Sequence, residues 1–101
     1  MPEKSYTVTV AKDLEDLIPG FVDNRRKELE SLRAALAAGA FEQLRQLGHR
    51  MKGVGMSYGF DRVSALGRQI EDGASAGDRD AVEARIAEYA EYLTHVRVVY
   101  E

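Results

Sequence analysis

Apolar residues recur at helical spacing over most of the chain. The first apolar face follows steps of mainly three and four residues and consists of Leu14, Leu17, Ile18, Phe21, Val22, Leu29, Leu32 and Leu36. Pro19 lies within this pattern and predicts either a kink or the first turn of the main helix, because proline has no amide hydrogen to donate. Gly39 predicts the end of this helix.

Three further apolar faces follow. They consist of Phe41, Leu44, Met51, Val54 and Tyr58; of Phe60, Val63, Leu66 and Ile70; and of Val82, Ile86, Tyr89, Leu93, Val96 and Tyr100. Gly59 predicts the end of the second helix and Asp61 a cap for the third. The small residues 73–77 predict a loop, and Asp78 or Asp80 a cap for the last helix.

Four amphipathic helices with short connections predict an all-α fold, an antiparallel up-and-down four-helix bundle with a short or kinked N-terminal helix. We expect residues 1–12 to form an N-terminal extended segment, a tail, because Tyr6–Val10 has an extended pattern. Residues 13–101 would form the bundle. A chain of 101 residues fits one domain.

Composition and charge narrow the classes of function. Acidic and basic residues are interleaved at a net charge of −3, which argues against nucleic acid as a partner. The absence of cysteine excludes disulfides and thiolate chemistry and agrees with a reducing compartment. The sequence shows neither a signal peptide nor an apolar stretch of about 20 residues. We expect a soluble, cytoplasmic monomer without a membrane partner.

The second helix carries an unusual outward face. Its core side consists of Phe41, Leu44, Gly48, Met51, Gly55 and Tyr58. His49 falls nearly opposite, with Arg45, Gly53 and Met56 on the same outward arc and Lys52 at its edge. The helix thus presents a histidine, two cations, a glycine and a methionine together.

Glycine within a helix costs about 1 kcal/mol relative to alanine, so three glycines here require a reason. Gly48 and Gly55 are on the core side and would let a neighbouring helix approach closely. Gly53 faces outward, which makes sense if another macromolecule must come close to His49. Met56 would give that partner an adaptable apolar contact, and Lys52 would attract an anionic group.

An exposed neutral imidazole can attack phosphorus and hold a phosphoryl group, while its other nitrogen is oriented by a hydrogen bond. We expect Glu71, near the end of the third helix, to orient His49. The alternative is that His49, Lys52, Met56 and Glu71 are ordinary surface side chains.

Other chemistry finds little support. His95 has neither glycine nor lysine beside it, so we interpret it as structural. The two histidines have no metal-site spacing, and no nucleotide-binding or kinase motif is present. The chain is therefore not expected to be an enzyme with its own ATP site, and its phosphoryl donor must be another protein or domain.

The segment from His49 to Phe60 resembles the histidine-containing phosphotransfer (HPt) domain of two-component phosphorelays. That family's motif is His-x-apolar-Lys-Gly followed by small residues and a glycine, and residues 49–59 match it. Residues 66–71 are similar to the family's third-helix pattern, and the likeness covers essentially the whole chain. Val54 departs from the pattern, because a small Ser or Ala is common at that position.

The resemblance implies a role for each motif residue. His49 would be the phosphoacceptor, Lys52 would steady the phosphoryl group, Gly53 would leave space for the partner, and Glu71 would orient the imidazole. The implied partner is a receiver domain with a phospho-aspartate and its own Mg²⁺, so the chain would need no cofactor.

Two alternatives remain. One is a helical interaction module without phosphorylation, which would dock partners on Gly53 and Met56. The other is an HPt-like domain excised from a larger hybrid or chemotaxis histidine kinase. Met1 and the absence of linker-like ends favour a stand-alone chain.

Overall fold

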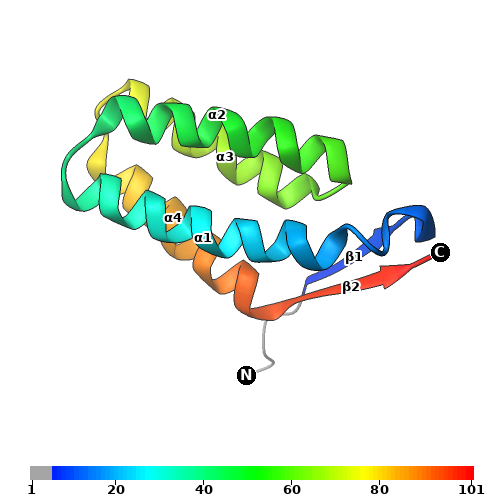
Figure 1. The fold of residues 1–101 in the computed structure, drawn as a ribbon. Helices are drawn as coiled ribbons and strands as arrows, with labels where there is room; N and C mark the ends of the chain where they lie inside the picture. The colour runs from blue at the N-terminus through cyan, green and yellow to red at the C-terminus, as the bar shows by residue number, and fades with distance from the viewer. Residues whose placement is uncertain (1–5) are drawn as a thin grey trace.

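The computed structural model describes residues 6–101, and four helices account for most of them (Figure 1). The helices are α1 (Ile18–Ala37), α2 (Phe41–Tyr58), α3 (Asp61–Ser75) and α4 (Arg79–His95), and a short 3₁₀ helix, η1 (Lys12–Leu14), precedes α1. In Figure 1, each helix begins at the end of the bundle where the preceding helix stops. The prediction of a helical fold with four main helices is confirmed.

Local sequence signals explain most of the helix ends. Pro19 lies in the first turn of α1, so it begins the helix and does not kink it. Gly59 ends α2 with a positive φ of 80°, a conformation that side chains with a Cβ rarely adopt. The Asp78 carboxylate caps α4 by accepting a hydrogen bond from the Ala81 amide at 3.1 Å. The predicted Asp61 cap is wrong, because Phe60 holds the N-cap position and no side chain caps α3.

The loop predicted at residues 73–77 begins later than expected. Helix α3 continues through Gly73 and ends at Ser75. Gly73 is accommodated because a Cβ at this position would come within 3.0 Å of the Val82 side chain on α4. Its small size thus serves helix packing and is not a stop signal.

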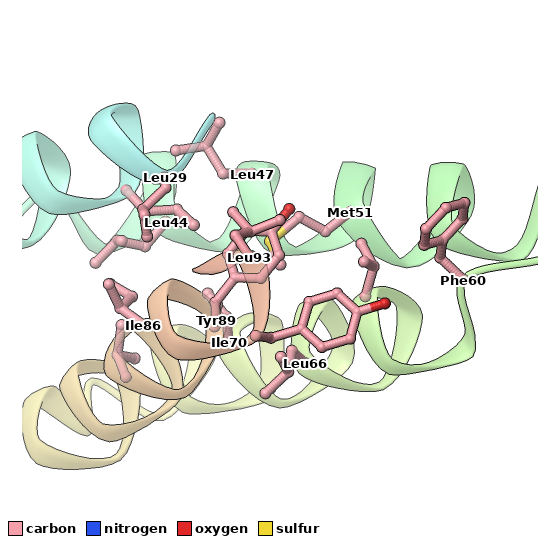
Figure 2. Close-up of a cluster of buried hydrophobic side chains, with 14 of the residues drawn as sticks. Leu29, Leu44, Leu47, Met51, Phe60, Leu66, Ile70, Ile86, Tyr89 and Leu93 are labelled. Carbon is pink, nitrogen blue, oxygen red and sulfur yellow. The ribbon is translucent and has the colours of Figure 1, made fainter. Parts of the chain in front are cut away.

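Each helix packs against two others, so that α1 contacts α2 and α4, and α3 contacts α2 and α4. The apolar faces meet in one core, part of which Figure 2 shows between the helices. Leu32, Leu44, Met51 and Ile70 are completely buried there. The helical faces read from the sequence are therefore the faces that pack together.

A buried polar contact joins α1 to α4 within this core. The Tyr89 hydroxyl donates a hydrogen bond to Oε1 of Glu28 at 3.0 Å. Burial raises the pKa of the Glu28 carboxyl, while the nearby Arg25 guanidinium and the Tyr89 hydrogen bond oppose this rise. The Arg50 guanidinium, next to His49 on α2, also opposes the rise in this pKa.

The last residues form a strand, which corrects the prediction that α4 extends to Tyr100. Helix α4 ends at His95, and β2 (Val96–Tyr100) pairs in parallel with β1 (Tyr6–Val10). Val96 and Tyr100 are spaced for one helical face, but the intervening residues alternate between half-buried and exposed, a period of two. Three valines in five residues also favour the extended conformation.

The N-terminal segment is therefore not a free tail over its described part. Tyr6 pairs with Val96 and Val10 with Tyr100, and Val10 is only 3% exposed. The ladder continues where the Glu101 amide donates to the Val10 carbonyl at 3.1 Å. Residues 1–5 of the predicted segment lie outside the described residues. The two ends of the described chain are thus joined beside the start of α1 (Figure 1).

Candidate functional site

The outward face of α2 carries the residues that the sequence singled out. The His49 side chain is 66% exposed, and Gly53 and Met56 are also exposed on this face. The opposite side of the helix, with Gly48, Met51 and Gly55, is buried. Helical periodicity accounts for this division, because Met51 lies two residues from His49 and therefore about 200° around the helix.

Three glycines bring α2 and α3 unusually close together, and we call Gly48, Gly55 and Gly67 the glycine seam. A Cβ at Gly48 would lie 2.7 Å from the Glu71 amide nitrogen, and one at Gly55 would lie 2.6 Å from the Ser64 amide nitrogen. Real Cβ atoms do not approach so closely. The close approach expected for Gly48 and Gly55 is therefore present, with α3 as the neighbouring helix.

Gly67 and Ser64 were not predicted from the sequence to have a role of their own. A Cβ at Gly67 would meet the Lys52 amide nitrogen at 2.6 Å, so Gly67 completes the seam from the side of α3. The Ser64 hydroxyl donates to the Lys52 carbonyl at 2.9 Å and ties the two backbones together. The sequence signal for the role of Gly67 was a glycine in the middle of the third predicted helix, where glycine is unfavourable unless packing requires it.

The close approach of α3 brings Glu71 to His49. Oε2 of Glu71 lies 2.8 Å from Nδ1 of His49, although the residues are 22 positions apart. An ionised carboxylate only accepts hydrogen bonds, so Nδ1 must carry the hydrogen. No hydrogen bond to Nε2 is recorded within residues 6–101. The arrangement fixes the tautomer of the ring and leaves the lone pair of Nε2 free.

Lys52 also contacts the Glu71 carboxylate. Its Nζ donates to Oε1 of Glu71 at 3.1 Å, so each carboxylate oxygen has one partner. The Lys52 hydrogen bond, followed by the His49 hydrogen bond, lowers the pKa of the Glu71 carboxyl against the opposing effect of burial. Glu71 is thus an anion at neutral pH, and its side chain is only 15% exposed.

Arg45 and Met56 lie on either side of His49 along α2, and we call His49 and Glu71 the dyad. Nε of Arg45 donates to Oε2 of Glu42 at 3.0 Å, and this bond raises the pKa of the guanidinium. Met56 is 70% exposed, and with Lys52 it lines an open groove of about 600 Å³ between α2 and α3. Arg68 of α3, which the sequence analysis did not assign to the site, lines the same groove.

The described part of the chain, residues 6–101, holds no group of three or more His, Cys, Asp or Glu residues that could bind a metal ion. Its helices are also too short or too polar to span a bilayer. His95 lies half-buried at the end of α4. The chemistry available at the site is therefore that of an oriented imidazole beside a carboxylate and an ammonium group.

Comparison with protein families agrees with this geometry, since a family described as Hpt domain matches residues 10–98. The chain belongs to the Hpt domain family. Hpt domains are phosphotransfer modules of two-component signalling; they exchange phosphoryl groups with receiver domains and are carriers, not kinases. No significant match was found among curated proteins or among solved structures. The matched range includes all four helices of this Hpt domain and the parts of β1 and β2 nearest to them.

Proposed function

We propose that this Hpt domain accepts a phosphoryl group on Nε2 of His49 from the phospho-aspartate of a receiver domain and returns it to such an aspartate. The observation that carries the proposal is the bond between Nδ1 of His49 and Glu71, which leaves Nε2 as the nucleophile on an exposed ring. The receiver domain would hold the Mg²⁺ ion, and this chain would need no cofactor.

The proposed transfer forms one bond and breaks one bond, and it moves no proton. The lone pair of Nε2 forms the nitrogen–phosphorus bond, and the bond between phosphorus and the aspartyl oxygen breaks, so the aspartate leaves as a carboxylate. The ring retains its hydrogen on Nδ1 and becomes positively charged. The Glu71 carboxylate faces that charge at 2.8 Å and stabilises it.

The neighbouring residues would serve the partner and the phosphoryl group. Lys52 sits near enough to share Glu71 with His49, so its ammonium can turn to an arriving phosphoryl oxygen. At Gly53, no described atom outside the surrounding turns of α2 lies within 4 Å of the position that a Cβ would take, which leaves an open approach. Arg45 and Met56 would contact the receiver on either side, with Met56 supplying apolar area.

The direct test is to mix the chain with a receiver domain labelled on its aspartate. We expect wild type to take up label that is acid-labile and alkali-stable, as a phosphohistidine is. His49→Gln should take up none, while the matched variant His95→Gln should behave as wild type. Equal labelling of His49→Gln would contradict the proposal.

The alternatives differ in binding and in the source of the phosphoryl group. If the chain is a helical interaction module without phosphorylation, the substitution His49→Ala leaves partner binding unchanged, and no donor produces a phosphohistidine. A domain of a larger kinase would keep the chemistry at His49 but take its phosphoryl group from another part of that kinase. We propose that the chain is cytoplasmic and acts as a monomer. Size-exclusion chromatography would test the monomeric state against the chain's mass of 11.2 kDa.

A further inference from the structure

We propose that Gly48 and Gly67 are positioning residues for His49. By lacking side chains they set the separation of α2 and α3 at which the Glu71 carboxylate reaches Nδ1 of the imidazole. The effect expected on phosphoryl transfer rests on the proposed function, whereas the effect on the tautomer of His49 does not.

The contacts of Gly48 place it directly against the backbone that carries Glu71. A Cβ at Gly48 would lie 2.7 Å from the amide nitrogen and 3.1 Å from the Cα of Glu71, and 2.7 Å from the Gly67 carbonyl oxygen. All three are backbone atoms, which cannot rotate aside as a flexible side chain could. A side chain at position 48 must therefore displace the backbone of α3 at Glu71.

Gly67 makes the reciprocal contact from α3. A Cβ there would lie 2.6 Å from the Lys52 amide nitrogen and 2.7 Å from the Gly48 carbonyl oxygen. These contacts lie on both sides of His49 in the sequence of α2. The two glycines thus close the interface at the level of the dyad.

The hydrogen bond at His49 leaves little room for such a displacement. An alanine at position 48 must open the contact by roughly 0.7 Å or more to reach ordinary van der Waals distance. The Nδ1–Oε2 distance is 2.8 Å, and an equal increase would carry it past the usual range for a hydrogen bond. A compensating rotation of the Glu71 carboxylate towards His49 would also disturb the 3.1 Å hydrogen bond between its other oxygen and Lys52.

Gly55 provides a matched control within the same seam. A Cβ there would lie 2.6 Å from the Ser64 amide nitrogen and 3.0 Å from the Phe60 carbonyl oxygen, so the clash is as severe as at Gly48. Gly55 lies seven residues from Gly48, about 10 Å along the helix, and none of its close contacts is with Glu71. A role in packing alone would make the two positions equivalent.

The experiment is to assign the hydrogen-bearing nitrogen of His49 by ¹⁵N NMR in the full chain. Wild type should show the hydrogen on Nδ1. Gly48→Ala and Gly67→Ala should move the ring towards the tautomer mixture of a free imidazole, and Gly55→Ala should keep the wild-type state. Phosphoryl uptake from a receiver should fall roughly tenfold to a hundredfold in the first two variants, as expected for a misplaced reacting group.

An unchanged tautomer in folded Gly48→Ala would overturn the inference, as would an equal change in Gly55→Ala. If Gly48→Ala does not fold, the NMR measurement is made in the Gly53→Ala background, because alanine at this open helical position adds stability. Failure of wild type to take up phosphoryl would remove the proposed function. The tautomer would still decide whether Gly48 and Gly67 position His49.

Discussion

At the scale of single residues, Glu71 is the centre of the site because it joins two groups that the chain places on another helix. One carboxylate oxygen accepts from His49 and the other from Lys52. The carboxylate orients the imidazole, keeps its Nε2 lone pair free, and holds the lysine beside it. In the proposed transfer its negative charge would matter as well, because a neutral group in the same place could orient the ring but would not stabilise the positive charge that phosphorylation places on it.

Replacement of Glu71 by Gln tests that charge. We expect Glu71→Gln to slow phosphoryl uptake by roughly tenfold or more, which corresponds to a loss of about 1.4 kcal/mol or more of charge stabilisation. The measurement is the transfer rate from a labelled receiver. The matched variant Glu83→Gln removes the same charge from an exposed position on α4 and should transfer at the wild-type rate. Equal rates for Glu71→Gln and wild type would show that the charge is not used.

The same substitution has a defined dependence on pH. Because the pKa of Glu71 is lowered in the folded state, its contribution to stability is present above its ordinary pKa of 4.5 and is lost as the pH falls through the lowered value. We expect wild type to exceed Glu71→Gln in free energy of unfolding by less than about 1 kcal/mol at neutral pH, since the group is partly screened. Urea unfolding at pH 7 and at pH 3 should show the difference shrinking in acid.

At the scale of elements, α2 is two-sided, and its glycines serve opposite purposes on the two sides. The seam glycines allow α3 to approach, and any side chain there meets backbone atoms. Gly53 faces open space, because beyond its own stretch of helix no atom of residues 6–101 lies within 4 Å of the position that a Cβ would take. The intrinsic cost of glycine in a helix is offset by packing in the first case and has no such compensation in the second.

Substitutions at Gly53 should therefore separate stability from function. Gly53→Ala should raise the free energy of unfolding by up to about 1 kcal/mol, through helix propensity alone. Gly53→Phe should leave the helix content intact while phosphoryl uptake falls sharply, because its ring would fill the approach to His49. Circular dichroism and the labelling assay measure the two effects. Unchanged uptake by Gly53→Phe would refute the role given to this glycine.

At the scale of the whole molecule, the parallel strands β1 and β2 join the two ends of the described chain outside the helical bundle. The pairing buries Val10 and leaves Val99 exposed. The strand pair lies near the turn between α2 and α3, since β1 and Gly59 line a common cleft. Gly59 is ten residues from His49, about 15 Å along a helix, so the strands support the fold without contacting the dyad.

Val10 provides the corresponding test. Val10→Ala should lower the free energy of unfolding by about 1–2 kcal/mol, from the loss of buried methyl groups, with no change in phosphoryl uptake. Val99→Ala on the partner strand should change stability by less than about 0.5 kcal/mol, because its side chain is 43% exposed. Urea unfolding measures both, and a loss of uptake in Val10→Ala would show that the strands act on the site.

The sequence alone determined the four helices and the outward position of His49, because helical periodicity and the glycine and proline signals are local properties of the chain. It did not distinguish strand from helix at residues 96–100, since Val96 and Tyr100 fit both periods and the pairing partner is some ninety residues away. The contact of His49 with Glu71 also required the tertiary structure. A distance of 2.8 Å between residues on different helices depends on how closely those helices pack, and in our proposal Gly48 and Gly67 decide it here.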